Sequence, residues 1–125
     1  MYKYFSISTD PLIKCQCDYG CGLSLADMNE DFMKRLDQAR EFAGVPFHIT
    51  SGIRCPLHNN DVSATGLHGP HTTGRAVCIY INNNEIRFLI RRSLILQGFH
   101  RFGTGSNFLH VDDSDEHPPN REWLY

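Results

Sequence analysis

The sequence predicts an α+β domain with a small, mainly antiparallel sheet and two main helices. Two segments carry apolar residues at helical spacing, and four short β-prone segments are separated by turn residues. The expected order is helix, strand, strand, helix, strand, strand, which is typical of this class. The 125 residues are expected to form one domain, 1–125, that buries a core without disulfide support.

The first helix is expected to follow an irregular segment, residues 1–26. Asp27 is the predicted N-cap, with Glu30 as its capping-box partner. Gly44 is the predicted end of the helix, and Pro46 prevents its continuation. The apolar face consists of residues three or four apart: Met28, Phe32, Leu36, Ala39 and Ala43.

The middle of the chain is predicted to form two strands around a long loop. Phe47–Thr50 is short, β-prone and bounded by proline and glycine, and Ala76–Ile81 is an apolar run. Residues 54–75 hold two prolines and three glycines, so we interpret them as a loop. Long loops in small domains are usually functional.

The last third of the chain is predicted to contain one helix and two strands. Asn82–Asn84 form a turn, and the helix that follows ends at Gly98. The strands are Phe99–Phe102 and Asn107–Val111, with residues 103–106 as the turn between them. From Asp112 to Asn120 we expect an acidic, proline-containing tail, which ends in Trp123-Leu-Tyr125. The apolar face of the helix consists of Ile86, Leu89, Ile90 and Leu94.

Composition argues against several classes of function. The net charge of −2 gives no indication of a nucleic-acid or anionic-membrane partner. No apolar run approaches the roughly 20 residues that a membrane helix needs. The first 14 residues lack the apolar centre of a signal peptide, so we expect synthesis in the cytoplasm. We expect a monomer that binds neither nucleic acid nor membrane.

Several side chains with metal-ligand chemistry lie where rigid elements can hold them. His71 lies near the end of the long loop, Cys78 lies in the next strand, and His110 lies in the last strand. Zinc hydrolases use three such ligands and keep a fourth position open. Asp112 lies two residues after His110, on the same side of a strand, and can orient that histidine or act as a general base. Arg54 could hold a carboxylate or an oxyanion.

The residues alone leave other interpretations open. His110 could equally be a packed core histidine. The chain has five cysteines, and an odd number argues against a full disulfide framework. Cys15, Cys17 and Cys21 could bind a second metal, but they lack an obvious fourth ligand, so we expect packed thiols or a local cross-link. The histidines interpreted as ordinary surface residues are His58, His68, His100 and His117.

Three separated motifs resemble the M15 zinc peptidases. They are TSGIRCPLHN at 50–59, GPHTTGRAV at 69–77 and FLHVD at 108–112. This group includes D-Ala-D-Ala carboxypeptidases and L-alanyl-D-glutamate endopeptidases, and it shares its fold with the hedgehog signalling domain. The likeness is to short phage and prophage members and runs from about Lys14 to Trp123. It therefore implies a hedgehog/DD-peptidase-like fold.

The resemblance also implies roles for individual residues. The family pattern is S-G-x-R, then H-x-x-G-x-A-x-D, then H-x-D or H-x-H. His71 matches the first zinc ligand, and His110 matches the ligand motif of the last strand. Arg54 matches the arginine that holds substrate or transition state. Asp112 matches the polar partner in the last motif, as general base or ligand support, and its role and that of His110 could be exchanged.

One position departs from the family pattern. The middle zinc ligand of the family is Asp, and this chain has Cys78 there. A thiolate is a good zinc ligand, so a His/Cys/His site is chemically sound. It also donates more charge than a carboxylate, which weakens the metal as a Lewis acid and raises the pKa of its bound water. We therefore expect reduced activity.

The resemblance implies a Zn²⁺-dependent peptidase that hydrolyses amide bonds in peptidoglycan stem peptides, as a carboxypeptidase or an endolysin-type endopeptidase. Its partner is then the stem peptide, and a phage holin or the virion brings it to the cell wall. The alternative is a catalytically weakened or inactive zinc-binding module that recognises cell-wall peptide or a virion partner. A third hypothesis is that the chain is a cysteine protein that senses redox state or metal ions.

Overall fold

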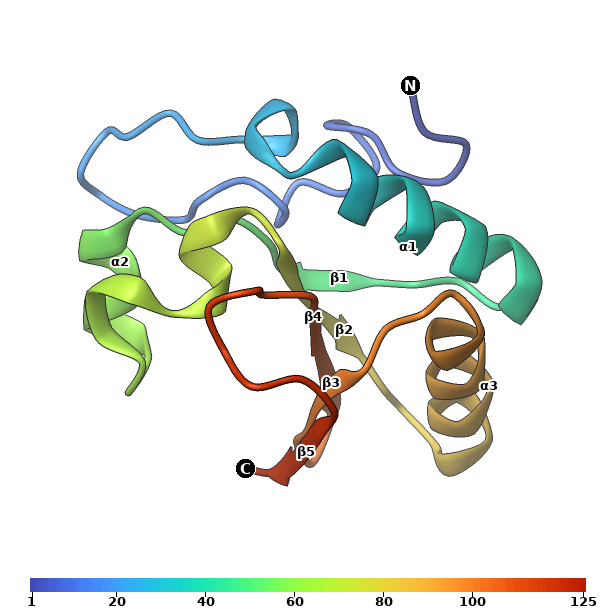
Figure 1. The fold of residues 1–125 in the computed structure, drawn as a ribbon. Helices are drawn as coiled ribbons and strands as arrows, with labels where there is room; N and C mark the ends of the chain where they lie inside the picture. Colours follow the sequence, from blue (N-terminus) through green and yellow to red (C-terminus); the bar gives the residue numbers. More distant parts are fainter.

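A five-stranded sheet in the order β1-β2-β4-β3-β5 forms the centre of the molecule (Figure 1). The computed structural model describes residues 1–125. Neighbouring strands are antiparallel except β3 and β5, which run parallel. The predicted α+β class and mainly antiparallel sheet are confirmed. The strands are β1 (Ile49–Ser51), β2 (Ala76–Tyr80), β3 (Arg101–Thr104), β4 (Phe108–Asp112) and β5 (Arg121–Leu124).

The helices divide between the two sides of the sheet. The two long helices, α1 and α3, pack against each other and against the core, whereas α2 lies at the opposite side of the molecule (Figure 1). None of the helices combines the length and apolarity needed to cross a bilayer. The α-helices are α1 (Glu30–Ala43), α2 (Pro56–Val62) and α3 (Asn84–Leu96), and the 3₁₀ turns are η1 (Leu25–Asp27), η2 (Gly66–His68) and η3 (Pro70–Thr73).

Alternation along β2 and β4 separates the core from the other face of the sheet. Val77 and Ile79 of β2 belong to the hydrophobic core with Val111 of β4. Because successive side chains of a strand point to opposite faces, Cys78 and His110 leave the core face. The register places these two residues directly opposite each other. The sheet therefore presents them side by side on the face that α1 and α3 do not cover.

The start of α1 differs from the prediction, and its end agrees with it. Asn29, rather than Asp27, is the N-cap, and its Oδ1 accepts the Phe32 N–H at 2.9 Å. Asp27 instead closes η1, where its carboxylate accepts the backbone N–H of Ser24 at 2.8 Å. The extended backbone of Met28 separates the two helical segments. Gly44 ends α1 in the left-handed conformation, at φ 70°.

The predicted strands of the second half are displaced by one or two residues. Gly103 lies inside β3, although glycine there favoured a turn. A side chain on Gly103 would collide with Trp123 of β5 and with Tyr125 beyond it, since a Cβ would lie 2.5 Å from the indole nitrogen of Trp123. The glycine therefore serves close packing of two strands. The tail was also misread, because residues 121–124 form β5 beside β3.

The interpretation of residues 54–75 as one long loop was wrong. This segment contains α2, η2 and η3. Helix α2 begins with Pro56 after the cap Cys55, whose Sγ accepts the N–H of His58 at 3.5 Å. Only Asn59 of α2 is buried, so the helix shows no apolar periodicity in the sequence. Most of its side chains are exposed; Val62 lines the pocket and Asn59 accepts a hydrogen bond from Arg54.

Candidate metal centre and pocket

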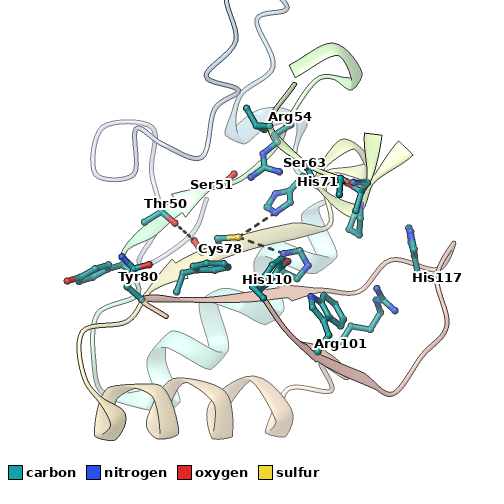
Figure 2. A pocket seen from close by; sticks show the side chains of 18 residues that line it. Thr50, Ser51, Arg54, Ser63, His71, Cys78, Tyr80, Arg101, His110 and His117 are labelled. Atoms are coloured by element: carbon teal, nitrogen blue, oxygen red, sulfur yellow. Dashed lines mark hydrogen bonds between the residues drawn. The ribbon is translucent and has the colours of Figure 1, made fainter. Parts of the chain in front are cut away.

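His71, Cys78 and His110 converge on one point above the sheet (Figure 2). The Cys78 Sγ lies 3.6 Å from His71 Nε2 and 3.8 Å from His110 Nδ1. The centroids of the two imidazole rings are 5.1 Å apart. Cys78 and His110 are cross-strand neighbours, and His71 reaches them from η3, which connects through Gly74 to β2. Three donor atoms from three elements therefore surround one position.

A tight turn at Gly74 sets the position of His71. Gly74 has a left-handed backbone at φ 74°, and a Cβ there would lie 2.9 Å from the carbonyl oxygen of Asp27. His71 itself is buried, with 5% of its surface exposed. Its Nδ1–H donates to the carbonyl oxygen of Gly52 at 2.7 Å. Because that carbonyl only accepts, the Nε2 lone pair is left to face Cys78.

His110 is oriented from behind by Asp112. Its Nε2–H donates to Asp112 Oδ2 at 2.7 Å, which leaves Nδ1 facing Cys78. Arg101 donates from Nε to the other carboxylate oxygen at 2.6 Å, and the N–H of Ser114 donates there as well at 3.1 Å. Burial opposes ionisation of Asp112, but the bonds from His110 and Arg101 hold its pKa below the usual value. A charged carboxylate thus fixes the ring of His110.

The donor set fits a zinc ion. Zinc–nitrogen and zinc–sulfur bonds of about 2.05 and 2.3 Å at a tetrahedral angle separate nitrogen from sulfur by about 3.6 Å. The separations from Cys78 to the two histidines are 3.6 and 3.8 Å. Both histidines have their second ring nitrogen bound to an oxygen acceptor, as metal-ligating histidines almost always do. Burial raises the pKa of Cys78 to about 11, so the ion must displace the thiol proton.

The three candidate ligands lie in a pocket of about 850 Å³. Arg54, from the segment between β1 and α2, lines the same pocket, as the sequence predicted (Figure 2). Its Nη1 donates to Asn59 Oδ1 at 3.0 Å, and its backbone N–H donates to the His71 carbonyl oxygen at 3.0 Å. Asp112 does not line the pocket; it is completely buried behind His110. No Asp or Glu is among the 18 lining residues.

Some pocket residues were missed by sequence reasoning. His117, interpreted as an ordinary surface residue, lines the pocket and bonds to Ser114 Oγ at 2.7 Å. Trp123 of β5 packs its ring 5.5 Å from the ring of His110. Arg101, buried to 6% exposure, completes the support of Asp112. None of these residues stands in a local motif; strand pairing and the 113–120 turn bring them to the site.

Acidification is expected to destabilise the metal-free protein through His71. Burial, with His110 and Arg54 nearby, lowers the pKa of His71 to about 3 in the folded state. An unfolded histidine has a pKa of about 6.5. Between these values the unfolded chain binds the extra proton, so stability falls as pH decreases, by up to about 1.4 kcal/mol per pH unit from this group.

Urea unfolding of chelated protein at pH 7.5, 6.5, 5.5 and 5.0 measures this effect before most carboxylates titrate. The free energy of unfolding should decline below pH 6.5. His71→Gln should reduce the slope, whereas His48→Ala, at an exposed histidine, should leave it unchanged. Constant stability from pH 6.5 to 5.0 in the natural chain would show that His71 accepts its proton without loss of structure.

Comparison with known proteins assigns the family. A family model described as Peptidase M15 matches residues 5–112, which include all three candidate ligands, Arg54 and Asp112 but not β5. No curated protein and no solved structure matches the chain, so the hedgehog-like fold stays a prediction. M15 proteins are peptidases that act on peptidoglycan-type substrates and are generally zinc-dependent. Because the match spans most of the 125 residues, the chain belongs to the M15 peptidase family.

Proposed function

We propose that this chain is a zinc-dependent peptidase that hydrolyses amide bonds in peptidoglycan stem peptides. The observation that carries the proposal is the convergence of His71 Nε2, Cys78 Sγ and His110 Nδ1 on one point of an open pocket. The matched family is a peptidase family, and the matched range, residues 5–112, includes all three residues. We also propose that the protein acts as a monomer, made in the cytoplasm and delivered to the cell wall by a phage holin or in a virion.

The pocket side chains divide the work between binding and orientation. A zinc ion held by His71, Cys78 and His110 would polarise the amide carbonyl and acidify a water molecule. The carbonyl of Gly52 and the carboxylate of Asp112 keep the two imidazole rings in the tautomers that ligation needs. Arg101 holds Asp112 in turn. This support is in place before any substrate binds.

Asp112 is better suited to positioning than to proton transfer. Its two oxygens accept hydrogen bonds from His110, Arg101 and the backbone of Ser114, and none of its surface is exposed. A general base must come within hydrogen-bond reach of the proton it removes. We therefore assign Asp112 the support of His110. His117 is the lining imidazole outside the ligand set, and we assign it the proton transfer.

Arg54 is the cation for the substrate. Asn59 occupies one of its N–H groups, which leaves other guanidinium donors for a carboxylate or an oxyanion. Stem peptides end in a carboxylate and carry a further acidic side chain. A pocket with Arg54 on its wall and no Asp or Glu in its lining suits such an anionic substrate.

Replacing Arg54 with alanine is expected to lower turnover of a cleavable stem peptide at least about tenfold, with little change in folding stability. Arg54→Lys should recover only part of the loss, because an ammonium group cannot bind a carboxylate in the bidentate manner of a guanidinium. Steady-state kinetics and thermal melts measure both. Arg92→Ala, at an exposed arginine of α3, is the matched control. Unchanged kinetics in Arg54→Ala would remove Arg54 from the site.

Digestion of purified peptidoglycan tests the function itself. Zinc-loaded protein should release new amino groups, chelated protein should not, and mass spectrometry of the fragments should identify the bond. The absence of a carboxylate from the pocket lining, together with Cys78, favours a second candidate, a module that binds cell-wall peptide with little or no turnover. Co-sedimentation with peptidoglycan without amine release would support that candidate and contradict the peptidase.

A further inference from the structure

A second cluster of candidate metal ligands, made of four cysteines, lies outside the pocket lining. The Sγ atoms of Cys15, Cys17, Cys21 and Cys55 all lie within 4.8 Å of one another. The first three come from the N-terminal segment, and the fourth stands at the start of α2. We propose that these four cysteines bind a second zinc ion, which is structural and separate from the ion of the pocket.

The spacing of the sulfur atoms matches a closed tetrathiolate site. Zinc–sulfur bonds of about 2.3 Å at a tetrahedral angle separate sulfur atoms by about 3.8 Å. Cys17 and Cys21 have their sulfur atoms 3.5 Å apart, and no pair exceeds 4.8 Å. All four thiols are free. Four thiolates in tetrahedral array favour zinc and fill its coordination, as in structural sites.

Backbone donors face three of the four sulfur atoms. The N–H of Cys55 donates to Cys15 Sγ at 3.3 Å. The N–H of Leu23 donates to Cys21 Sγ, and the N–H of His58 donates to Cys55 Sγ, both at 3.5 Å. N–H groups directed at sulfur stabilise the negative charge of thiolates. The local backbone therefore favours negative charge on three of the four ligands.

The loop from Cys15 to Leu23 explains how an unusual spacing forms a site. The N–H of Cys15 donates to the carbonyl oxygen of Leu23 at 3.0 Å, which closes the loop. Gly20 and Gly22 have positive φ values of 71° and 72°, so the chain reverses sharply beside Cys21. The sequence offered no obvious fourth ligand, because Cys55 is distant in the chain and joins the loop only through the fold.

The site connects the N-terminal segment to the wall of the pocket. Cys55 directly follows Arg54, which lines the pocket. The N–H of Ile53 donates to the carbonyl oxygen of Ile13 at 3.0 Å, and a Cβ on Gly52 would lie 2.5 Å from that oxygen. An ion at Cys55 would therefore hold the segment that carries Arg54 and the Gly52 carbonyl against the first 28 residues.

Metal analysis of the full chain, purified under reducing conditions and loaded with zinc, tests the proposal. The natural protein should contain two zinc ions per chain. Cys17→Ser and Cys55→Ser should each contain one, and so should His110→Ala. The combination of Cys17→Ser with His110→Ala should contain none. Cys78→Ser serves as the matched control, since it removes a thiol but leaves the four-cysteine site whole.

Cobalt substitution separates the two sites by their ligands. Thiolate-to-cobalt charge-transfer absorption increases with the number of thiolates, so four-thiolate binding gives a stronger band than one thiolate. The strong band should persist in His110→Ala and Cys78→Ser and should collapse in Cys17→Ser. This result does not depend on peptidase activity. A protein that lacks cleavage but keeps the strong band would therefore contradict the function proposed for the pocket and leave the four-cysteine site supported.

A measurement on the natural chain covers the case in which a variant fails to fold. Under non-denaturing conditions, zinc should protect the four thiols of this site from a thiol reagent, in addition to any protection of Cys78. A chelator should make these four thiols reactive again. One zinc per natural chain, with the same content in Cys17→Ser, would overturn the proposal. A mass two hydrogens lower with no zinc at these residues would also overturn it, in favour of a disulfide.

Discussion

Replacing His110 with alanine is expected to remove the pocket metal and to lower peptidoglycan cleavage by about a hundredfold or more. Second-sphere changes alone typically cost 10- to 100-fold in metal affinity or activity, and this change removes a ligand. His110 is also the link between Cys78 and the Asp112–Arg101 pair. Its loss leaves two ligands where zinc in hydrolases uses three.

The experiment compares zinc content, amine release and thermal melts for His110→Ala and His48→Ala. His48 is exposed beside β1, so its replacement should change none of these quantities. Asp112→Asn forms the intermediate case, since an amide can still accept from His110 but carries no charge. It should weaken zinc binding by about 10- to 100-fold. Full cleavage by a folded His110→Ala would place the chemistry elsewhere.

Replacing Cys78 with aspartate is expected to keep the pocket zinc and to raise peptidoglycan cleavage, or to create it where the natural chain shows none. The direction of the side chain is set by β2, in which Val77 and Ile79 anchor the opposite face in the core. Only the ligand atom changes. A carboxylate donates less charge than a thiolate, so the metal becomes a stronger Lewis acid.

Both proteins must be assayed with saturating zinc under reducing conditions, because oxidation of the Cys78 sulfur would change the ligand. Cys78→Ser is the matched control, because it removes the thiolate ligand without supplying a carboxylate in its place. It should bind the pocket zinc weakly and should not gain activity. If Cys78→Asp abolishes an activity that the natural chain has, the thiolate is a working ligand suited to this site, and the account of it as a handicap is wrong.

The faces of Cys78 and His110 could be predicted from the sequence because each depends on strand geometry, whereas the role of His71 was implied by the resemblance to the M15 family. Because successive side chains of a strand point to opposite faces, a strand over residues 76–81 with Val77 and Ile79 in the core puts Cys78 on the other face. His110 and Asp112 are two residues apart in one strand, so they share a face. The resemblance to the M15 motif implied a tight turn at Gly74, and the left-handed backbone there brings His71 to β2.

Boundaries were less predictable where local signals competed with packing. Gly103 favoured a turn, but it lies in β3, where a side chain would collide with the indole of Trp123. Asp27 has a side chain suited to the N-cap of α1, but its carboxylate accepts the backbone N–H of Ser24 in the capping box of η1 instead. Helix α2 buries only Asn59, so no apolar face predicted it, and its start depends on Pro56 and the cap at Cys55.

What the sequence by itself determined was the α+β class and the shared face of His110 and Asp112, since both follow from periodicity; the set of three candidate metal ligands was implied by the resemblance to the M15 family. Only the tertiary structure decided that Asp112 is buried behind His110 under Arg101, and that Trp123 covers the same histidine. It alone brought Cys55 to the loop of Cys15. These contacts join segments far apart in the chain, and their geometry depends on strand pairing and loop closure that no local pattern encodes.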